Sequence, residues 1–114
     1  MKKRDRIAFH KMISYAEEIQ SYAHGLHFEQ FARDRKTINA CAFLIGQIGE
    51  LVNVIDAETQ KKYAKIPWRN IKGMRNRIVH NYEKVDYTVL WGTITESMAQ
   101  LAELIAEALD SPEI

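Results

Sequence analysis

The chain has 114 residues, 46% of them apolar, and a formal net charge of +1. This length suits one domain with a single core, and we treat residues 1–114 as one domain. No apolar run approaches the roughly 20 residues that cross a bilayer. The charged residues after the basic start argue against a signal peptide, so we expect a soluble, cytoplasmic protein. The single cysteine, Cys41, excludes an internal disulfide and lies in an apolar stretch, which predicts a buried structural thiol.

Apolar residues at three- and four-residue steps predict helices in the first half of the chain. One spans roughly residues 5–24 and ends at Gly25, and a short helical turn follows over residues 27–33. The clearest apolar stripe covers residues 38–55, with Asp34 or Thr37 as the expected N-cap. Gly46 and Gly49 in this helix each cost about 1 kcal/mol against alanine. We therefore expect them to allow another helix to approach closely.

Pro67 suits the first turn of a further helix, which we expect to extend over residues 67–82. Asp86 is the expected N-cap of the last helix, which ends near Asp110. Its apolar stripe is formed by Leu90, Ile94, Met98, Leu101, Ile105 and Ala108. Four main helices with short connections predict an all-α, up-and-down bundle of four to five helices.

Charge is unevenly distributed along the chain. Residues 59–82 hold seven cations and no carboxylate, whereas residues 83–114 hold seven acids and one lysine. Such a basic block can neutralise phosphates whatever the net charge of the protein is. The alternative is that the basic helix faces the acidic C-terminal helix, and charge alone does not decide between the two.

The basic helix has two different faces when residues 67–82 are projected at 100° per residue. Ile71, Met74, Ile78 and Tyr82 form a core stripe, and Arg75 lies about 40° from Ile71 within it. Arg75 must therefore either run its stem along the core and reach the surface or meet a carboxylate. Glu50 is the candidate carboxylate, with a plain surface glutamate as the equal alternative. The other face carries no large apolar residue and consists of Arg69, Lys72, Gly73, Asn76, Arg77 and His80.

Arg75 and His80 suit the cleavage of RNA by its own 2′-hydroxyl. An imidazole can move the proton, and a guanidinium can stabilise the charge that builds on the phosphate oxygens. Asn76 can orient the ring or hold a phosphate oxygen, and the chemistry needs no metal or other cofactor. On an ideal helix, however, Arg75 and His80 are separated by about 140°. Either the helix is distorted there, or the two side chains act from different protomers.

The pattern Arg75-x4-His80-x-Tyr82 resembles the Arg-x4-His-x-Tyr motif of HepT toxins, a branch of the HEPN superfamily. The flanks are similar as well: Ile48-Gly49-Glu50, the segment from Ile66 to Asn76, then Val85-Asp86 and Trp91. The similarity covers nearly the whole chain. One departure is Leu51-Val52, where the family often has alanine after the glutamate, and it concerns packing more than chemistry.

The resemblance implies a homodimeric HEPN-like bundle in which both copies of the motif line a basic cleft. It implies an endoribonuclease toxin with Arg75 and His80 as catalytic residues, supported by Asn76 and Glu50. Arg69, Lys72 and Arg77 are the expected RNA-phosphate contacts. The expected partner is a minimal nucleotidyltransferase antitoxin that transfers AMP onto Tyr82. A bulky anion two residues from His80 would then block the phosphate site.

Two other functions remain open. One is a non-catalytic HEPN bundle that binds nucleotide, RNA or a nucleotidyltransferase partner, and the other is a purely structural dimerisation bundle. A metal site at His10, His24 and His27 is disfavoured, because Gly25 breaks the helix between the last two. Trp68 and Trp91 could stack on bases, but packing is the favoured role for both.

Overall fold

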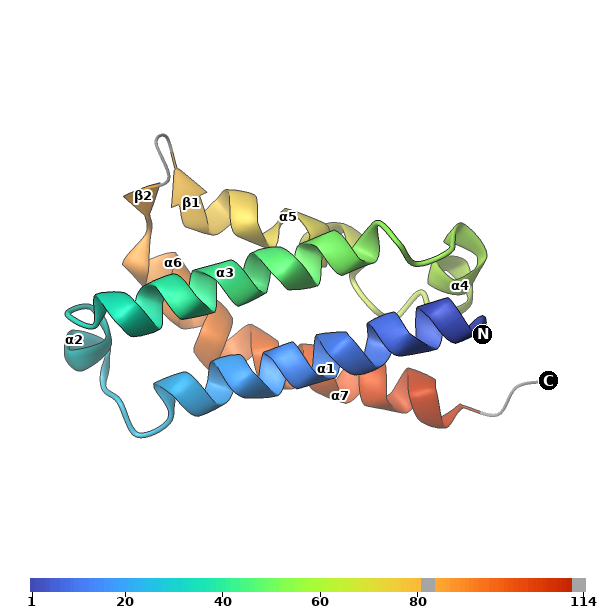
Figure 1. Cartoon of the computed structure of the whole chain (residues 1–114), viewed down its shortest axis with the longest axis horizontal. Coiled ribbons are helices and arrows are strands. Elements are labelled where there is room, and N and C mark those ends of the chain that lie inside the picture. The colour runs from blue at the N-terminus through green and yellow to red at the C-terminus, as the bar shows by residue number, and fades with distance from the viewer. Residues whose placement is uncertain (81–83, 112–114) are drawn as a thin grey trace.

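The computed structural model describes residues 1–80 and 84–111. The long helices are α1 (Lys3–Ala23), α3 (Arg35–Val52), α5 (Trp68–Ile78) and α7 (Met98–Asp110). The short helices are α2 (Phe28–Phe31), α4 (Ala57–Lys62) and α6 (Tyr87–Gly92). A two-stranded hairpin, β1 (Val79–His80) and β2 (Lys84–Val85), separates α5 from α6. Successive long helices alternate in direction (Figure 1), so the predicted all-α, up-and-down bundle is confirmed.

Caps fix the boundaries of the first helices much as the sequence predicts. Gly25 adopts a φ of 81° just after α1, a conformation that side chains with a Cβ disfavour. Asp34 is the N-cap of α3 and accepts hydrogen bonds from the Thr37 backbone N–H at 3.1 Å and the Thr37 hydroxyl at 2.7 Å. The hydrogen bond from the Thr37 hydroxyl, which is the larger cause, and the one from the Thr37 backbone together hold the pKa of Asp34 below its ordinary value.

The predicted extension of α5 to residue 82 is wrong, because the helix ends at Ile78. Val79 is extended (φ −102°, ψ 119°) and pairs with Val85 in an antiparallel register. The Asp86 backbone N–H then donates to the Ile78 carbonyl at 2.7 Å, which closes the base of the hairpin. Both paired valines are β-branched residues, which favour extended backbone over helix. Pro67 is the N-cap of α5 rather than a residue of its first turn.

The last helical stretch of the chain is not wound uniformly along its length. Asp86 caps it by accepting from the Val89 backbone N–H at 3.0 Å, as predicted. A π-helical segment, Thr93–Ser97, then joins α6 to α7. The predicted apolar stripe is buried along its whole length, from Leu90 through Ile94 and Met98 to Ala108.

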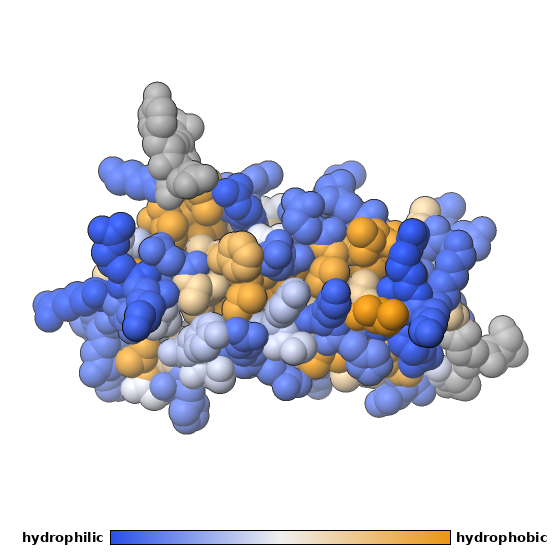
Figure 2. Space-filling view, viewed as in Figure 1, coloured by the Kyte–Doolittle hydropathy of each residue, from blue (hydrophilic) through white to orange (hydrophobic). Residues whose placement is uncertain are grey.

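The core is built around α1 and α3. Helix α1 packs on α3 and α7, and α3 packs on α5. Cys41 is fully buried in this core, and burial raises the pKa of its thiol to about 11, so the predicted structural thiol is confirmed. In the described part of the chain, no helix is long and apolar enough to cross a membrane. Figure 2 shows charged and polar side chains over much of the face formed by α1 and α3, interrupted by apolar ones.

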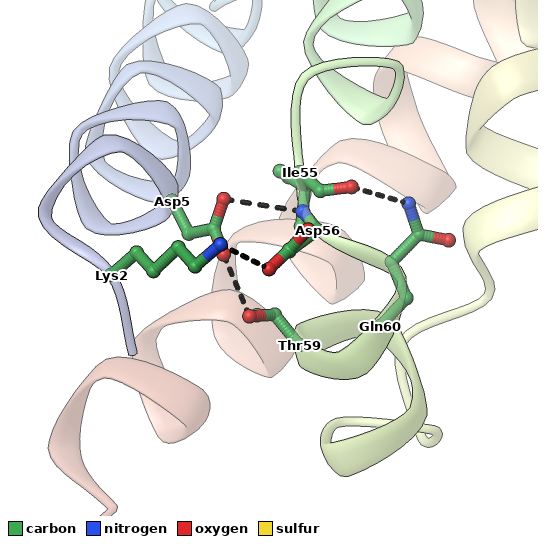
Figure 3. Close-up of polar contacts among 6 residues, drawn as sticks. All are labelled: Lys2, Asp5, Ile55, Asp56, Thr59 and Gln60. Atoms are coloured by element: carbon green, nitrogen blue, oxygen red, sulfur yellow. Dashed lines mark hydrogen bonds and ion pairs between the residues drawn. The ribbon is translucent and has the colours of Figure 1, made fainter.

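A buried carboxylate, Asp5, holds the start of α1 against the connection between α3 and α4 (Figure 3). It accepts hydrogen bonds from the Asp56 backbone N–H at 3.2 Å and from the Thr59 hydroxyl at 2.6 Å. Lys2 pairs with the Asp56 carboxylate at 2.8 Å on the exposed side of the same cluster. Gln60 donates to the Ile55 carbonyl at 3.2 Å, which fixes the same connection. The cluster therefore ties the N-terminal turn to the end of α3.

We expect Asp5→Ala to lower the free energy of unfolding by about 2 kcal/mol, because two buried donors lose their acceptor. Chemical denaturation followed by circular dichroism measures this loss. Lys2→Ala is the control, and we expect it to change stability little because the lysine is 67% exposed. Equal stability of the two variants would contradict the structural role given to Asp5.

Candidate active site

The exposed side of α3 and the C-terminal end of α5 border a hollow of about 460 Å³, closed on one side by the hairpin. Its lining residues on α3 recur every three or four positions, so they form one helical face. The lining is formed by Asn39, Ala42, Phe43, Gly46, Gln47, Glu50, Arg75, Val79 and Val85. Figure 2 shows apolar side chains gathered over α3 near the hairpin. The hollow thus combines an apolar rim with one cation and one carboxylate.

Arg75 reaches this hollow by crossing α3 at a glycine. A Cβ at Gly46 would lie 3.2 Å from the Arg75 Cδ, so the arginine stem occupies the space that a side chain would take. One turn further along α3, a Cβ at Gly49 would lie 3.4 Å from the Lys72 carbonyl oxygen. Both glycines therefore permit the close approach predicted for them. Arg75 is exposed rather than buried, so its stem covers apolar surface while its charge reaches water.

Glu50 lines the same hollow as Arg75, so the structure brings together the two residues that the sequence paired. Within the described residues, no ion pair of 4.0 Å or less joins them. Glu50 is exposed and instead accepts a long hydrogen bond of 3.5 Å from the Asn53 amide. The hollow therefore presents an arginine whose charge is not neutralised by a direct contact with Glu50.

The early end of α5 removes the basis of the 140° separation calculated for an ideal helix. His80 belongs to β1, and its backbone pairs with Lys84 rather than continuing the helix. Within a single chain the helix ends before His80, and the second explanation, that the two side chains act from different protomers, stays a prediction. Asn76 is exposed on α5 and does not line the hollow. Tyr82, the predicted AMP acceptor, lies outside the described residues, as does Asn81.

The other predicted phosphate contacts lie elsewhere on α5. Arg69 and Lys72 are exposed and line a separate hollow of about 470 Å³, together with residues at the end of α3 and on α4. Arg77 folds back along its own helix and donates to the Asn70 carbonyl at 2.9 Å. The guanidinium lies over Gly73, 3.4 Å from the position that a Cβ would take there. Arginine has five donors, so this contact leaves others for a phosphate.

The structure divides the basic block between two environments. Lys62 and Lys65 line a hollow beside Glu107 of the acidic last helix, so part of the block does face acidic sequence. The cations of α5 do not follow this pattern, because α5 packs chiefly on α3 whereas α7 packs chiefly on α1. The positive charge of α5 is thus available on the α3 side of the bundle.

Both tryptophans pack inside the protein. Trp68 donates from its indole N–H to the Gln60 carbonyl at 3.0 Å and to the Tyr63 carbonyl at 3.2 Å. Trp91 lies against Phe31, with ring centroids 4.8 Å apart. The favoured packing role is therefore confirmed for both. Within residues 1–80 and 84–111, no three histidine, cysteine or carboxylate side chains are grouped as metal ligands.

Sequence reasoning missed Phe43 and Asn39 as residues of the site. Phe43 is 64% exposed, the most exposed of the large apolar side chains in the described part of the chain. The sequence did contain a signal for Phe43, because this large apolar residue lies on the polar face of an amphipathic helix. An exposed aromatic on the polar face of a central helix indicates a contact surface.

Comparison with known proteins identifies relatives over most of the chain. A family model described as Ribonuclease HepT-like matches residues 12–108. A protein of Caldanaerobacter subterraneus subsp. tengcongensis, provisionally named an RNase, is 34% identical over 85 residues, which cover 75% of this chain and 76% of the relative. A protein of Methanocaldococcus jannaschii, also provisionally named an RNase, is 33% identical over 94 residues, 82% of this chain and 81% of the relative.

A third relative comes from Thermococcus cleftensis and is named a probable ribonuclease HepT. It is 34% identical over 85 residues, which cover 75% of this chain and 77% of the relative. No solved structure matches the chain.

We expect Gly46→Ala to keep or raise stability, by up to about 1 kcal/mol, because alanine favours the helix and the arginine stem it meets is flexible. Gly92→Ala is the matched control, since a Cβ there meets nothing within 4 Å. Denaturation gives the stability, and the ¹⁵Nε NMR signal of Arg75 reports the displaced guanidinium. An unchanged Arg75 signal in Gly46→Ala would contradict the contact between the two residues.

Proposed function

The chain belongs to the family described as Ribonuclease HepT-like, and we propose that it is a metal-independent endoribonuclease whose active site is the hollow beside Arg75. The single observation that carries the proposal is the placement of Arg75. Its stem lies over Gly46, its charge is exposed in the hollow, and the hairpin that contains His80 forms the adjoining wall. This arrangement supports a role for Arg75 in binding phosphate and for His80, which follows the lining residue Val79, as the general acid–base residue.

The proposed reaction is a transesterification within the RNA. The 2′-oxygen forms a bond to the adjacent phosphorus while the bond from phosphorus to the 5′-oxygen breaks, which leaves a 2′,3′-cyclic phosphate and a 5′-hydroxyl. His80 takes the proton from the 2′-hydroxyl, and a protonated imidazole or water supplies one to the 5′-oxygen. Arg75 stabilises the extra negative charge on the phosphate oxygens. Asn76 and Glu50 support the site, and Arg69, Lys72 and Arg77 bind phosphates farther along the RNA.

A second copy of the chain is the proposed cover of the apolar rim. Phe43, Ala42, Val79 and Val85 surround the hollow, and an exposed apolar rim of this kind suits a subunit interface. A homodimer would bring two Arg75 side chains and two hairpins to one cleft, and one histidine could then serve as base and the other as acid. Sedimentation of the wild type and of Phe43→Glu tests this arrangement.

The proposed physiological role is that of a cytoplasmic toxin. Its partner is a minimal nucleotidyltransferase antitoxin, which neutralises it by transferring AMP from ATP onto Tyr82 with release of pyrophosphate. The resemblance of Arg75-x4-His80-x-Tyr82 to the HepT motif supports this role. The added phosphate would compete with RNA phosphate near His80.

We expect the wild type to cleave total RNA in the presence of EDTA, and we expect His80→Ala and Arg75→Ala to lower the rate by at least about 100-fold. Arg4→Ala, an exposed arginine at the other end of the bundle, is the control and should retain activity. Intact RNA with the dimeric, unmodified wild type would leave a non-catalytic bundle that binds RNA or nucleotide as the function.

We expect Tyr82 to gain one AMP when the chain is incubated with ATP, magnesium and a nucleotidyltransferase encoded beside it. Intact-mass spectrometry measures the addition, and peptide mapping assigns it. Tyr82→Phe should remain unmodified, whereas Tyr87→Phe should be modified like the wild type. Modification of the Tyr82→Phe variant would contradict the assignment of the acceptor.

A further inference from the structure

A second hollow, of about 380 Å³, lies on the other side of the hairpin base from Arg75. Its lining comes from the start of α3, from β2 and from the start of α6: Arg35, Ile38, Asn39, Lys84, Val85 and Tyr87. Asn39 and Val85 also line the hollow that contains Arg75. The two hollows therefore share two lining residues and lie next to each other.

The chemistry of the second hollow is that of a nucleotide site. Arg35 and Lys84 are exposed cations on two different elements, so they approach the hollow from two sides. Tyr87 is 39% exposed although it lies in the first turn of α6, and it offers an aromatic face beside the cations. Asn39 is exposed and carries both a donor and an acceptor.

Two carboxylates that are close to these cations along the chain, Asp34 and Asp86, act as helix N-caps. Asp34 accepts its hydrogen bonds from Thr37 as the N-cap of α3, and Asp86 accepts from the Val89 backbone as the N-cap of α6. Both carboxylates are thus oriented toward helix N-termini. Among its described lining residues the hollow has two cations, an aromatic ring and no carboxylate, a set that suits an anion with a flat, apolar part.

We propose that this hollow binds the nucleotide next to the scissile phosphate of a single-stranded RNA. Tyr87 stacks on the base, Arg35 and Lys84 contact the flanking phosphate, and Asn39, which lines both hollows, hydrogen-bonds the base edge. Base stacking on an aromatic ring together with a cationic track is the usual means of binding single strands. The inference rests on the proposed ribonuclease function and adds to it a substrate subsite with its own residues.

The test measures binding of a fluorescein-labelled, mixed-sequence single-stranded RNA of about 12 nucleotides by anisotropy, in a His80→Ala background that prevents cleavage. Stacking on one aromatic ring contributes about 1–3 kcal/mol, so Tyr87→Ala should weaken binding roughly 5- to 150-fold. Tyr87→Phe keeps the ring and should bind within about twofold of the parent. Tyr22→Ala, a tyrosine 42% exposed on α1, is the matched control.

The cations give an independent readout. Arg35→Ala and Lys84→Ala should each reduce the slope of log Kd against log salt concentration by about 0.7, because each removes one phosphate contact with a single strand. A double-stranded RNA of the same length should bind more weakly and should not respond to Tyr87→Ala. Sedimentation of every variant shows whether the oligomeric state is unchanged.

Three outcomes would overturn the inference, and they are distinguishable. If Tyr87→Ala and Tyr22→Ala bind alike while Arg75→Ala weakens binding, the subsite is wrong and the ribonuclease proposal stands. If Tyr87→Ala changes the oligomeric state instead of RNA affinity, the surface is a subunit interface. If the parent binds no RNA, the proposed function fails together with its subsite.

Discussion

The close crossing of α3 and α5 is the constraint on which the candidate site depends. Two glycines one turn apart on α3 make it possible: Gly49 meets the backbone of α5, and Gly46 meets the side chain of Arg75. A side chain at Gly46 would displace the flexible arginine stem, whereas one larger than alanine at Gly49 would press on the backbone of α5. The same glycines weaken α3 as an isolated helix, so packing against α1 and α5 must supply the stability that propensity does not. The glycines thus lower the intrinsic stability of α3, and one of them, Gly46, makes room for the stem of Arg75.

The sequence predicted the helical framework well because each boundary has a local cause. Two of these boundaries are N-caps, formed by the side chains of Asp34 and Asp86, and the third is the left-handed backbone of Gly25. Each can be recognised in a window of a few residues. The apolar stripes of α3 and the last helix were equally clear. The close-approach role of Gly46 and Gly49 could also be predicted, since a glycine inside a strong helix needs a packing reason.

The end of α5 could not be predicted in the same way. The hairpin depends on the pairing of Val79 with Val85, which are six residues apart in the chain. Helical periodicity does not predict such a pairing. The projection therefore placed His80 on a helix that ends two residues earlier. It left open whether Arg75 reaches the surface or meets a carboxylate, and the structure shows an exposed Arg75 with its stem over Gly46. Arg77 shows a similar limit, because its contact with the Asn70 carbonyl joins residues seven positions apart, which helical periodicity does not predict. The predicted pairing of Glu50 with Arg75 is correct in that both residues line the same hollow, but in the part of the chain that the structure describes no ion pair joins them.

The π-helical segment Thr93–Ser97 has a consequence for how the length of this chain can vary. A π turn holds about one residue more than an α turn, and such turns occur as single bulges within α-helices. Leu90, Ile94 and Met98 are each four residues apart, yet all three are buried, because the wider turn absorbs the drift that this spacing produces in a regular helix. Loss of one residue from the exposed part of this turn, at Thr95 or Glu96, would restore regular winding and keep both flanking halves facing the core. The last helix can therefore lose one residue at this turn without a change in the hairpin or in the crossing of α3 and α5.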